Sequence, residues 1–202
     1  MRGIRRLSTF AGFFAVAGAC GFVCGPAVAQ AQPVPHGVIQ KFEANGLGTG
    51  LATPLSSCPP GASVGDTCYG ISGNVSGDPI GNGTFTGTLD VSNVTVDNGS
   101  SGLCAPASGT MTLSFNGSKQ SITMGFVGDY CDIAQGSLSA ASEPTTLNGN
   151  FFVTGGSGSR FSKLNGDYAS GGAGAGTLVI SGDSLIGSLA LVLKGILEFA
   201  LQ

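Results

Sequence analysis

Tryptophan is absent from the 202 residues, histidine occurs once, at position 36, and charged residues make up only 9% of the chain. With one histidine, a Ser-His-Asp triad or an imidazole-based zinc site would depend on His36 alone. Three of the eight basic residues, Arg2, Arg5 and Arg6, stand at the start of the chain. Because the rest of the chain has five basic residues against eleven acidic ones, it offers no basic surface for nucleic acid.

Glycine is abundant, with 36 residues, and serine, threonine and asparagine are also frequent. Glycine and the β-branched residues disfavour helix interiors, so the composition favours an all-β fold. The glycines do not follow a Gly-X-Y period, and apolar residues recur between them, which argues against collagen and against a disordered chain. Without the leader described next, about 170 residues remain, enough for one domain with its own core.

The first 29 residues have the parts of a secretory signal peptide. A basic start precedes an apolar run over residues 10–23, and Ala27-Val28-Ala29 has the small-x-small pattern that signal peptidase cleaves. We expect cleavage after Ala29 or Ala31 and a mature protein that is secreted or periplasmic. A minor alternative is a lipoprotein attached through Cys20.

Export to an oxidising compartment changes the expected role of cysteine. Four cysteines remain after the leader is removed, and we expect them to form disulfides: Cys58, Cys68, Cys104 and Cys131. No C-x-x-C spacing occurs among them and His36 is the only histidine, so we expect no metal centre.

The composition changes near residue 66. Residues 30–66 contain an extended arm and then a stretch rich in Gly, Pro and Ser, which we interpret as a long loop tied down by Cys58 to Cys68. Only residues 37–44 in this part have the character of a short strand. Residues 67–202 are expected to form the β-domain, because apolar residues alternate along them.

The clearest local pattern is a β-hairpin over residues 109–126. Apolar residues alternate with polar ones on both sides of Asn116-Gly117, the strongest two-residue hairpin turn. A two-residue turn predicts three cross-strand pairs: Phe115 with Ser118, Leu113 with Gln120, and Met111 with Ile122. In this register the apolar residues of both strands lie on one face.

The same register places Cys104 opposite Asp129, two residues from Cys131. A bulge that absorbs this offset would allow a Cys104–Cys131 disulfide to close the open end of the hairpin. This favours the pairing of Cys58 with Cys68 and of Cys104 with Cys131 over the two other connectivities.

Two further segments alternate. Over residues 83–97 the apolar residues change from odd to even positions, so we expect a bulge or turn at Ser92-Asn93. Residues 185–199 are apolar or Gly at every odd position, which favours a buried strand, with a Leu-rich helix as the alternative. This run is short and carries Lys194 and Glu198, so no integral membrane segment is expected in the mature chain.

The segment Phe151-Phe152-Val153-Thr154-Gly155-Gly156-Ser157-Gly158-Ser159-Arg160-Phe161, followed by Gly166 and by Lys194-Gly195-Ile196-Leu197, resembles secreted bacterial relatives of the allene oxide cyclase and dirigent barrels. The resemblance covers residues 83–199. Its glycine loop carries over at Gly155, Gly156 and Gly158, and no catalytic residue of the family maps onto this chain.

This resemblance implies a closed antiparallel β-barrel of about eight strands, whose interior can hold one small apolar ligand. In such families the plant members cyclise an unsaturated epoxide or steer the coupling of phenolic radicals, and the barrel shapes the ligand more than it reacts with it. No cofactor is implied.

We therefore expect a secreted barrel that binds a small apolar or amphipathic ligand without covalent chemistry. The expected lining residues are apolar and face one side of their strands: Phe85, Leu89, Met111, Leu113, Phe115, Ile122, Met124 and Phe126. Arg160, beside the glycine loop, either orients a ligand carboxylate or forms a structural ion pair. The alternatives are a structural or adhesive cell-surface protein and an isomerase or cyclase that uses the barrel cavity.

Overall fold

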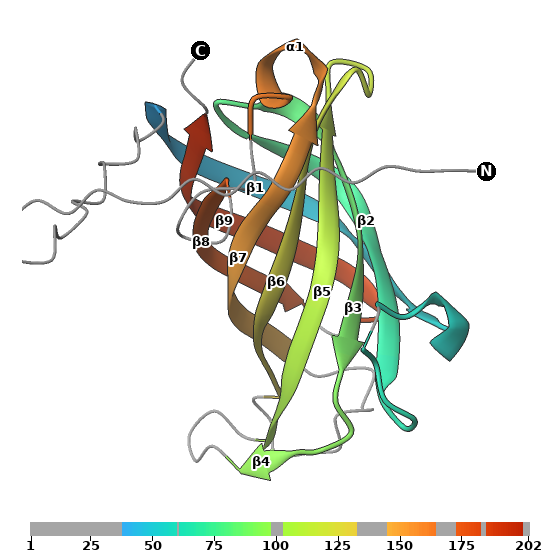
Figure 1. Cartoon of the computed structure of the whole chain (residues 1–202). Coiled ribbons are helices and arrows are strands. Elements are labelled where there is room, and N and C mark those ends of the chain that lie inside the picture. The colour runs from blue at the N-terminus through green and yellow to red at the C-terminus, as the bar shows by residue number, and fades with distance from the viewer. Residues whose placement is uncertain are drawn as a thin grey trace, which may run out of the picture. The chain divides into compact units, whose positions relative to one another are not determined.

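The computed structural model describes residues 38–59, 61–97, 103–132, 145–164, 173–182 and 185–199, so the expected signal peptide and the arm expected over residues 30–36 lie outside the described residues. The strands are β1 Val38–Thr53, β2 Thr67–Asp78, β3 Gly81–Val91, β4 Val96–Asp97, β5 Leu103–Phe115, β6 Gln120–Asp132, β7 Thr145–Ser157, β8 Gly174–Gly182 and β9 Gly187–Phe199 (Figure 1). A 3-10 turn, η1 Leu55–Ser57, and a four-residue helix, α1 Gly158–Phe161, complete the fold.

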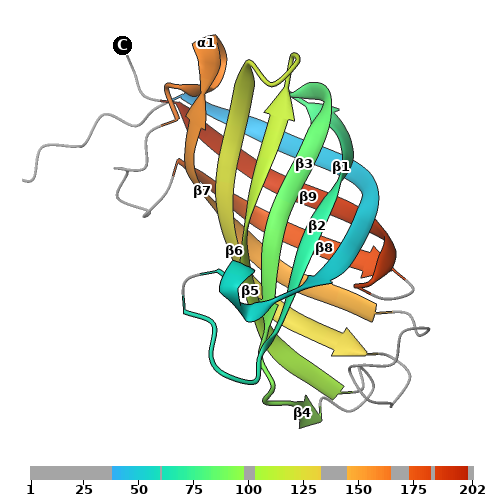
Figure 2. The same cartoon turned by 90° about the vertical axis from the view of Figure 1, so that its right-hand side faces the viewer.

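The strands form one antiparallel sheet in the order β3-β2-β1-β9-β8-β7-β6-β5-β4. An additional pairing of β3 with β5 joins the sheet to itself, so that eight strands make a closed barrel and β4 extends from β5 outside the ring. Figure 2 shows the strands crossing the barrel wall obliquely, as closure requires. The prediction of an all-β, eight-stranded antiparallel barrel is confirmed.

The first strand of the barrel is longer than the composition of residues 30–66 predicts. Residues 45–53, expected to belong to a loop, continue β1, which pairs with β2 on one side and β9 on the other. Gly46 and Gly50 are buried, where a larger side chain would meet neighbouring strands. The low apolar content that suggested a loop therefore reflects close packing inside the barrel.

The β5–β6 hairpin forms where it was predicted, but its register differs by two residues. Four residues, Asn116 to Lys119, form the turn, and Phe115 pairs with Gln120 instead of Ser118. Three consecutive positive φ angles, at Asn116, Gly117 and Ser118, make this longer turn. A shift of two residues preserves the facing of every side chain, so the predicted apolar face is correct although the predicted pairs are wrong.

The corrected register explains the disulfides. Cys104 lies directly opposite Cys131, without the bulge that a two-residue turn would have required. The predicted connectivity is confirmed, with Cys58 bonded to Cys68 and Cys104 bonded to Cys131. Both disulfides lie at the end of the barrel that contains the β1–β2 and β3–β5 connections.

Two other local predictions agree with the structure. The regular strand β3 ends at Val91, and the chain bends at Asn93 before β4, as the change of alternation indicated. The backbone N–H of Ser92 still donates to the carbonyl of Pro106 at 2.9 Å. The apolar run near the C-terminus is strand β9, not a helix.

Large apolar side chains of the described strands pack together inside the barrel, and glycines face several of them. Five buried phenylalanines each pair with a glycine of the neighbouring strand: Phe42 with Gly195, Phe85 with Gly73, Phe115 with Gly83, Phe126 with Gly109, and Phe151 with Gly176. An eight-stranded barrel is only wide enough for its side chains to fill it, so alternating large and small residues allow the rings to fit.

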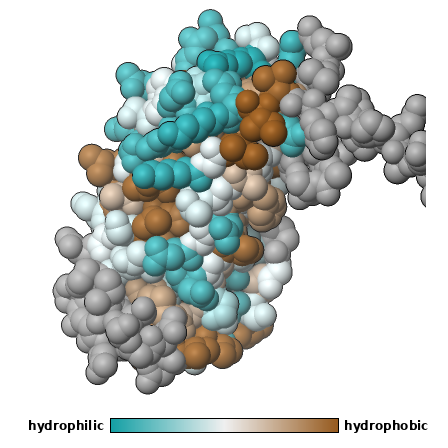
Figure 3. Space-filling view, turned by 90° about the vertical axis from the view of Figure 1, so that its left-hand side faces the viewer, coloured by the Kyte–Doolittle hydropathy of each residue, from teal (hydrophilic) through white to brown (hydrophobic). Residues whose placement is uncertain are grey.

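The outer wall is mainly Ser, Thr and Asn with scattered apolar residues. Figure 3 shows one side of the molecule, where brown apolar patches are separated by teal and white polar ones. On this wall Phe152 covers Gly125 of the neighbouring strand. This pair resembles the phenylalanine–glycine pairs of the interior, but it lies on the outer face of the sheet. Within the described residues, no helix has the length and apolar character needed to cross a membrane.

Candidate functional site

The eight apolar residues predicted to line the interior do face inward. Each has an exposed fraction of 2% or less, and all belong to one core cluster: Phe85, Leu89, Met111, Leu113, Phe115, Ile122, Met124 and Phe126. Their packing against one another makes them the hydrophobic core of the barrel. The hollows described below lie elsewhere, on the wall and at one end.

The predicted glycine loop is placed differently from the prediction. Gly155 and Gly156 belong to β7, which continues to Ser157, and only Gly158 leaves the strand. The register between β6 and β7 shifts next to Met124, and the Thr154 hydroxyl donates to the carbonyl of Thr123 at 3.1 Å. Gly158 has φ +81° and opens α1, a backbone conformation that favours glycine.

Helix α1 is held on the barrel end by one buried ring. Phe161 is 1% exposed and its ring centroid lies 5.9 Å from that of Phe115 and 6.3 Å from that of Phe199. On the exposed side, the Gln120 side-chain amide donates to Ser159 Oγ at 3.3 Å. These contacts determine the position of the residue between Ser159 and Phe161.

That residue is Arg160, the one polar residue predicted to contact a ligand. Its Nη1 donates to the carbonyl of Pro79 at 2.8 Å, and its guanidinium carbon lies 5.7 Å from the Phe161 ring centroid. Asp167, an acidic residue seven positions further along the chain, lies outside the described residues. Among the described residues no acidic side chain forms an ion pair with Arg160.

A hollow of about 500 Å³ adjoins Arg160, and we call it the basic end pocket. Its lining combines two cations with apolar and neutral polar side chains: Val38, Gln40, Ser159, Arg160, Lys163 and Phe199. Lys163, like Arg160, forms no ion pair with a described residue. By contrast, Lys41 lies 3.3 Å and Lys194 3.9 Å from carboxylate oxygens of Glu43 on the outer wall.

Of this pocket, the sequence alone indicated only Arg160. Val38 and Phe199 come from opposite ends of the described chain and meet because β1 pairs with β9. An isolated β-bridge between Leu164 and Phe199 brings the chain after α1 to the same place. No local pattern around Lys163 marks it as a pocket residue, because Val38, Gln40 and Phe199 lie more than 30 positions away in the sequence.

A second hollow, of about 600 Å³, crosses the outer wall over β9, β1, β2 and β3. Three asparagines and Ser76 supply its polar groups, and Leu47, Ala190 and Val192 supply apolar ones; the asparagines are Asn45, Asn74 and Asn82. None of its lining residues is charged. The backbone of Gly46, Val75 and Gly83, whose positions pair across the strands, contributes to its surface.

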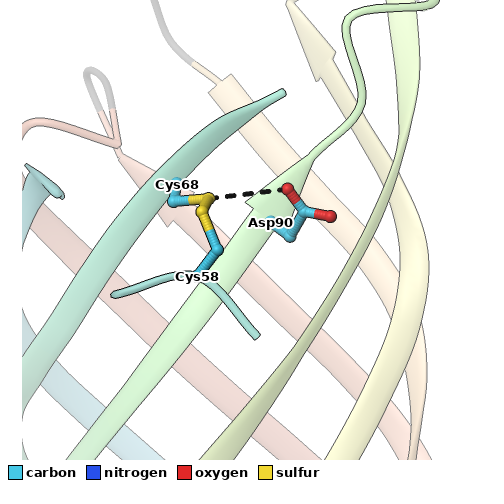
Figure 4. Close-up of side chains that lie close together, drawn as sticks. All are labelled: Cys58, Cys68 and Asp90. Carbon is cyan, nitrogen blue, oxygen red and sulfur yellow. Dashed lines mark hydrogen bonds between the residues drawn. A yellow bond between two sulfur atoms is a disulfide. The ribbon is translucent and has the colours of Figure 1, made fainter. Parts of the chain in front are cut away.

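The opposite end of the barrel contains a disulfide beside a carboxyl group. Figure 4 shows Cys68 on β2, Asp90 on the neighbouring β3, and Cys58 reaching them from the preceding loop. Sγ of Cys68 lies 3.6 Å from Oδ1 of Asp90. Among the described residues these three side chains are the set that comes close enough to share a metal ion, but here the two sulfurs are bonded to each other.

Burial affects the titration of two groups at this end. It raises the pKa of the Asp90 carboxyl above its ordinary value, and the neighbouring charge of Asp66 raises it further. Burial also raises the pKa of the Tyr69 phenol, with a smaller contribution from Tyr130. Tyr69 belongs to the core cluster.

The chain matches no protein-family model, no curated protein and no solved structure. The resemblance of Phe151–Phe161 to the allene oxide cyclase and dirigent barrels therefore stays a prediction that rests on those residues alone.

Proposed function

We propose that this protein binds a small amphipathic anion, without covalent chemistry, in the basic end pocket of a secreted or periplasmic β-barrel. The ligand class is a carboxylate, or a similar acid, attached to an apolar group. Arg160 and Lys163 would bind the acid, while Val38 and Phe199 would contact the apolar part. The two disulfides are compatible with the oxidising compartment that this proposal assumes.

The observation that carries the proposal is the pair of cations without acidic partners among the described residues. In a chain that has few charges and a negative balance, Arg160 and Lys163 lie beside one hollow and next to exposed parts of apolar side chains. The bond from Arg160 to Pro79 restrains the guanidinium and leaves several of its donors for a ligand. A restrained cation loses less side-chain entropy on binding than a free one.

Calorimetric titration of the purified protein with decanoate and with uncharged decanol tests this. We expect decanoate to bind at least tenfold more tightly than decanol, because one charge-assisted hydrogen bond contributes about 1.5–3 kcal/mol. Arg160→Gln and Lys163→Gln should each weaken decanoate binding. Lys119→Gln, an exposed cation of the β5–β6 turn outside the pocket lining, is the matched control and should bind as the wild type does.

Equal affinity for decanoate and decanol, or an equal loss in the Lys119→Gln variant, would contradict the proposed role of the pocket. A complete absence of binding would favour the second candidate, a structural role at the cell surface. That candidate is supported by the core cluster, in which the residues expected to contact a ligand pack against one another.

The isomerase or cyclase alternative has less support. It requires a polar group that faces an internal cavity, and the buried candidates at inward-facing strand positions among the described residues are Tyr69, Tyr130 and Thr145. All three are packed in the interior, with exposed fractions of 7%, 2% and 4%. Their burial suits a role in packing better than contact with a substrate.

A further inference from the structure

The two disulfides of the barrel have different surroundings. Cys104 and Cys131 are buried, with exposed fractions of 4% and 7%, and they join two directly paired strands. Cys58 instead lies half-buried in a loop, and its partner Cys68 contacts the carboxyl group of Asp90 (Figure 4). One atom from each of Cys58, Cys68 and Asp90 lies within 4.8 Å of the others.

We propose that reduction of the Cys58–Cys68 disulfide converts this cluster into a binding site for a thiophilic divalent metal ion of the Zn²⁺ class. The two thiolates and the Asp90 carboxylate supply three ligands, and a water molecule occupies the fourth position. The disulfide keeps the site closed in an oxidising environment, and a reducing one opens it.

The separations suit a tetrahedral ion. With Zn–S bonds of about 2.3 Å and Zn–O bonds of about 2.0–2.2 Å, sulfur and oxygen ligands of one zinc ion lie about 3.5 Å apart, and two sulfurs about 3.8 Å apart. The distance from Cys68 Sγ to Asp90 Oδ1 is already 3.6 Å. Once the covalent bond is broken, each sulfur has to move by only about 1 Å from its bonded position.

Two of the three ligands are held by the sheet. Cys68 and Asp90 are a directly opposed pair on β2 and β3, and their side chains project from the same face of the barrel wall. Only the loop with Cys58 has to adjust. The end of this loop, just before β2, is held by Asp66, whose carboxylate accepts hydrogen bonds from the backbone N–H groups of Ser63 at 2.7 Å and Asn93 at 3.1 Å.

The charge of the site also suits a dication. When a metal ion binds, the two thiols lose their protons, and the two thiolates and the Asp90 carboxylate then carry three negative charges that face the ion. Asp66 is close enough to interact electrostatically with Asp90 and adds to the negative charge of the surroundings. A soft divalent ion offsets these charges and prefers the sulfur ligands.

The opening step is a thiol–disulfide exchange with a dithiol. A thiolate of the dithiol attacks Sγ of Cys58, breaks its bond to Cys68 and forms a mixed disulfide; the second thiol then releases Cys58. Two electrons and two protons pass to the protein, and the dithiol becomes a cyclic disulfide. Binding of the metal ion to the two thiols then releases two protons.

Binding of Co²⁺ at the proposed site can be measured by absorption spectroscopy. The full protein is treated with a limited amount of dithiothreitol, desalted without oxygen and titrated with Co²⁺ alone. We expect one Co²⁺ per chain, near-ultraviolet absorption from thiolate-to-metal charge transfer and the strong visible bands of a tetrahedral ion, all removed by one equivalent of Zn²⁺. Alkylation and mass analysis of peptides should show that Zn²⁺ protects Cys58 and Cys68 while Cys104 and Cys131 are still bonded.

Asp90→Asn tests the third ligand while it leaves both thiols in place. We expect it to weaken Co²⁺ binding at least tenfold, whereas Asp129→Asn, an exposed acid on β6, should leave the affinity unchanged. Three outcomes would overturn the proposal: reduced protein with free thiols that binds no Co²⁺, equal affinity in wild type and Asp90→Asn, or protection of Cys104 and Cys131 instead. Reduced protein that unfolds, as judged by circular dichroism, and does not refold with Zn²⁺ would overturn it as well.

Discussion

Phe85 on β3 lies directly opposite Gly73 on β2, and its ring occupies the space that a side chain at position 73 would need. A Cβ atom added to Gly73 would lie 2.7 Å from Cε1 of Phe85. Gly46 and Gly48 of β1 border the same ring, at 3.1 and 2.7 Å from the corresponding Cβ positions. The abundance of glycine in this chain is thus partly a consequence of placing large rings inside a narrow barrel.

The first prediction concerns Gly73. Gly73→Ala should destabilise the protein by about 2 kcal/mol or more, because the new methyl group meets both the Phe85 ring and the backbone of β1. The matched control is Gly125→Ala, where the opposing ring is Phe152 on the outer wall, 40% exposed and able to turn outward. We expect that variant to change the free energy of unfolding in urea by less than about 1 kcal/mol; equal losses would refute the packing explanation.

The second prediction separates two adjacent glycines of β7. A Cβ on Gly156 would lie 2.5 Å from the carbonyl oxygen of Phe161 and 2.9 Å from its Cβ, whereas one on Gly155 has no neighbour within 4 Å. Gly156→Ala should therefore displace α1 with Arg160, and Gly155→Ala should not. The measurement is decanoate affinity together with thermal unfolding. An unchanged affinity in Gly156→Ala, if decanoate binds to the wild type, would show that the position of α1 does not matter for binding.

The third prediction compares the two disulfides. Their cysteines are 27 and 10 residues apart, for Cys104–Cys131 and Cys58–Cys68 respectively. In the chain-entropy model, loss of the longer crosslink costs about 3.5 kcal/mol and loss of the shorter one about 2.7 kcal/mol. Double alanine variants of each pair, compared by urea unfolding, should follow this order. The reverse order would mean that native contacts of the loop with Cys58 matter more than loop length.

The fourth prediction concerns the β5–β6 turn. Gly117 has φ +63°, and a Cβ added to it would have no atom within 4 Å, so backbone conformation alone disfavours a side chain there. Gly117→Ala should cost about 1–2 kcal/mol. Gly117→Asn should cost less, because asparagine tolerates the left-handed region better than alanine. Unfolding midpoints of the two variants give the comparison, and a larger loss in the asparagine variant would show that the turn changes shape.

Local sequence patterns predicted much of the fold correctly. Alternation over residues 109–126 determined which side chains face the core, and this survived an error of two residues in the register because side-chain facing repeats every two residues. The length of the β5–β6 turn was predicted wrongly. Asn116-Gly117 has the composition of a two-residue turn, and nothing in these two residues indicates that Ser118 also adopts a positive φ.

The glycines led to a wrong prediction in two places for one reason. Gly46, Gly48 and Gly50 suggested a loop, as did Gly155 and Gly156, yet all five lie in strands. A glycine inside a strand looks like a turn when the strand is read alone. For Gly46, Gly48 and Gly50, the atoms that occupy the adjacent space belong to residues more than 20 positions away in the sequence.

By itself, the sequence determined the all-β class, the facing of the core residues and the pairing of the cysteines, because each depends on short-range alternation or on covalent chemistry. Only the tertiary structure decided where the two proposed sites lie. Barrel closure brings Val38, Arg160 and Phe199 to one end, and strand pairing places Asp90 against Cys68 at the other. These neighbours are far apart in the chain, so the geometry of the closed sheet, and no local signal, assembles both sites.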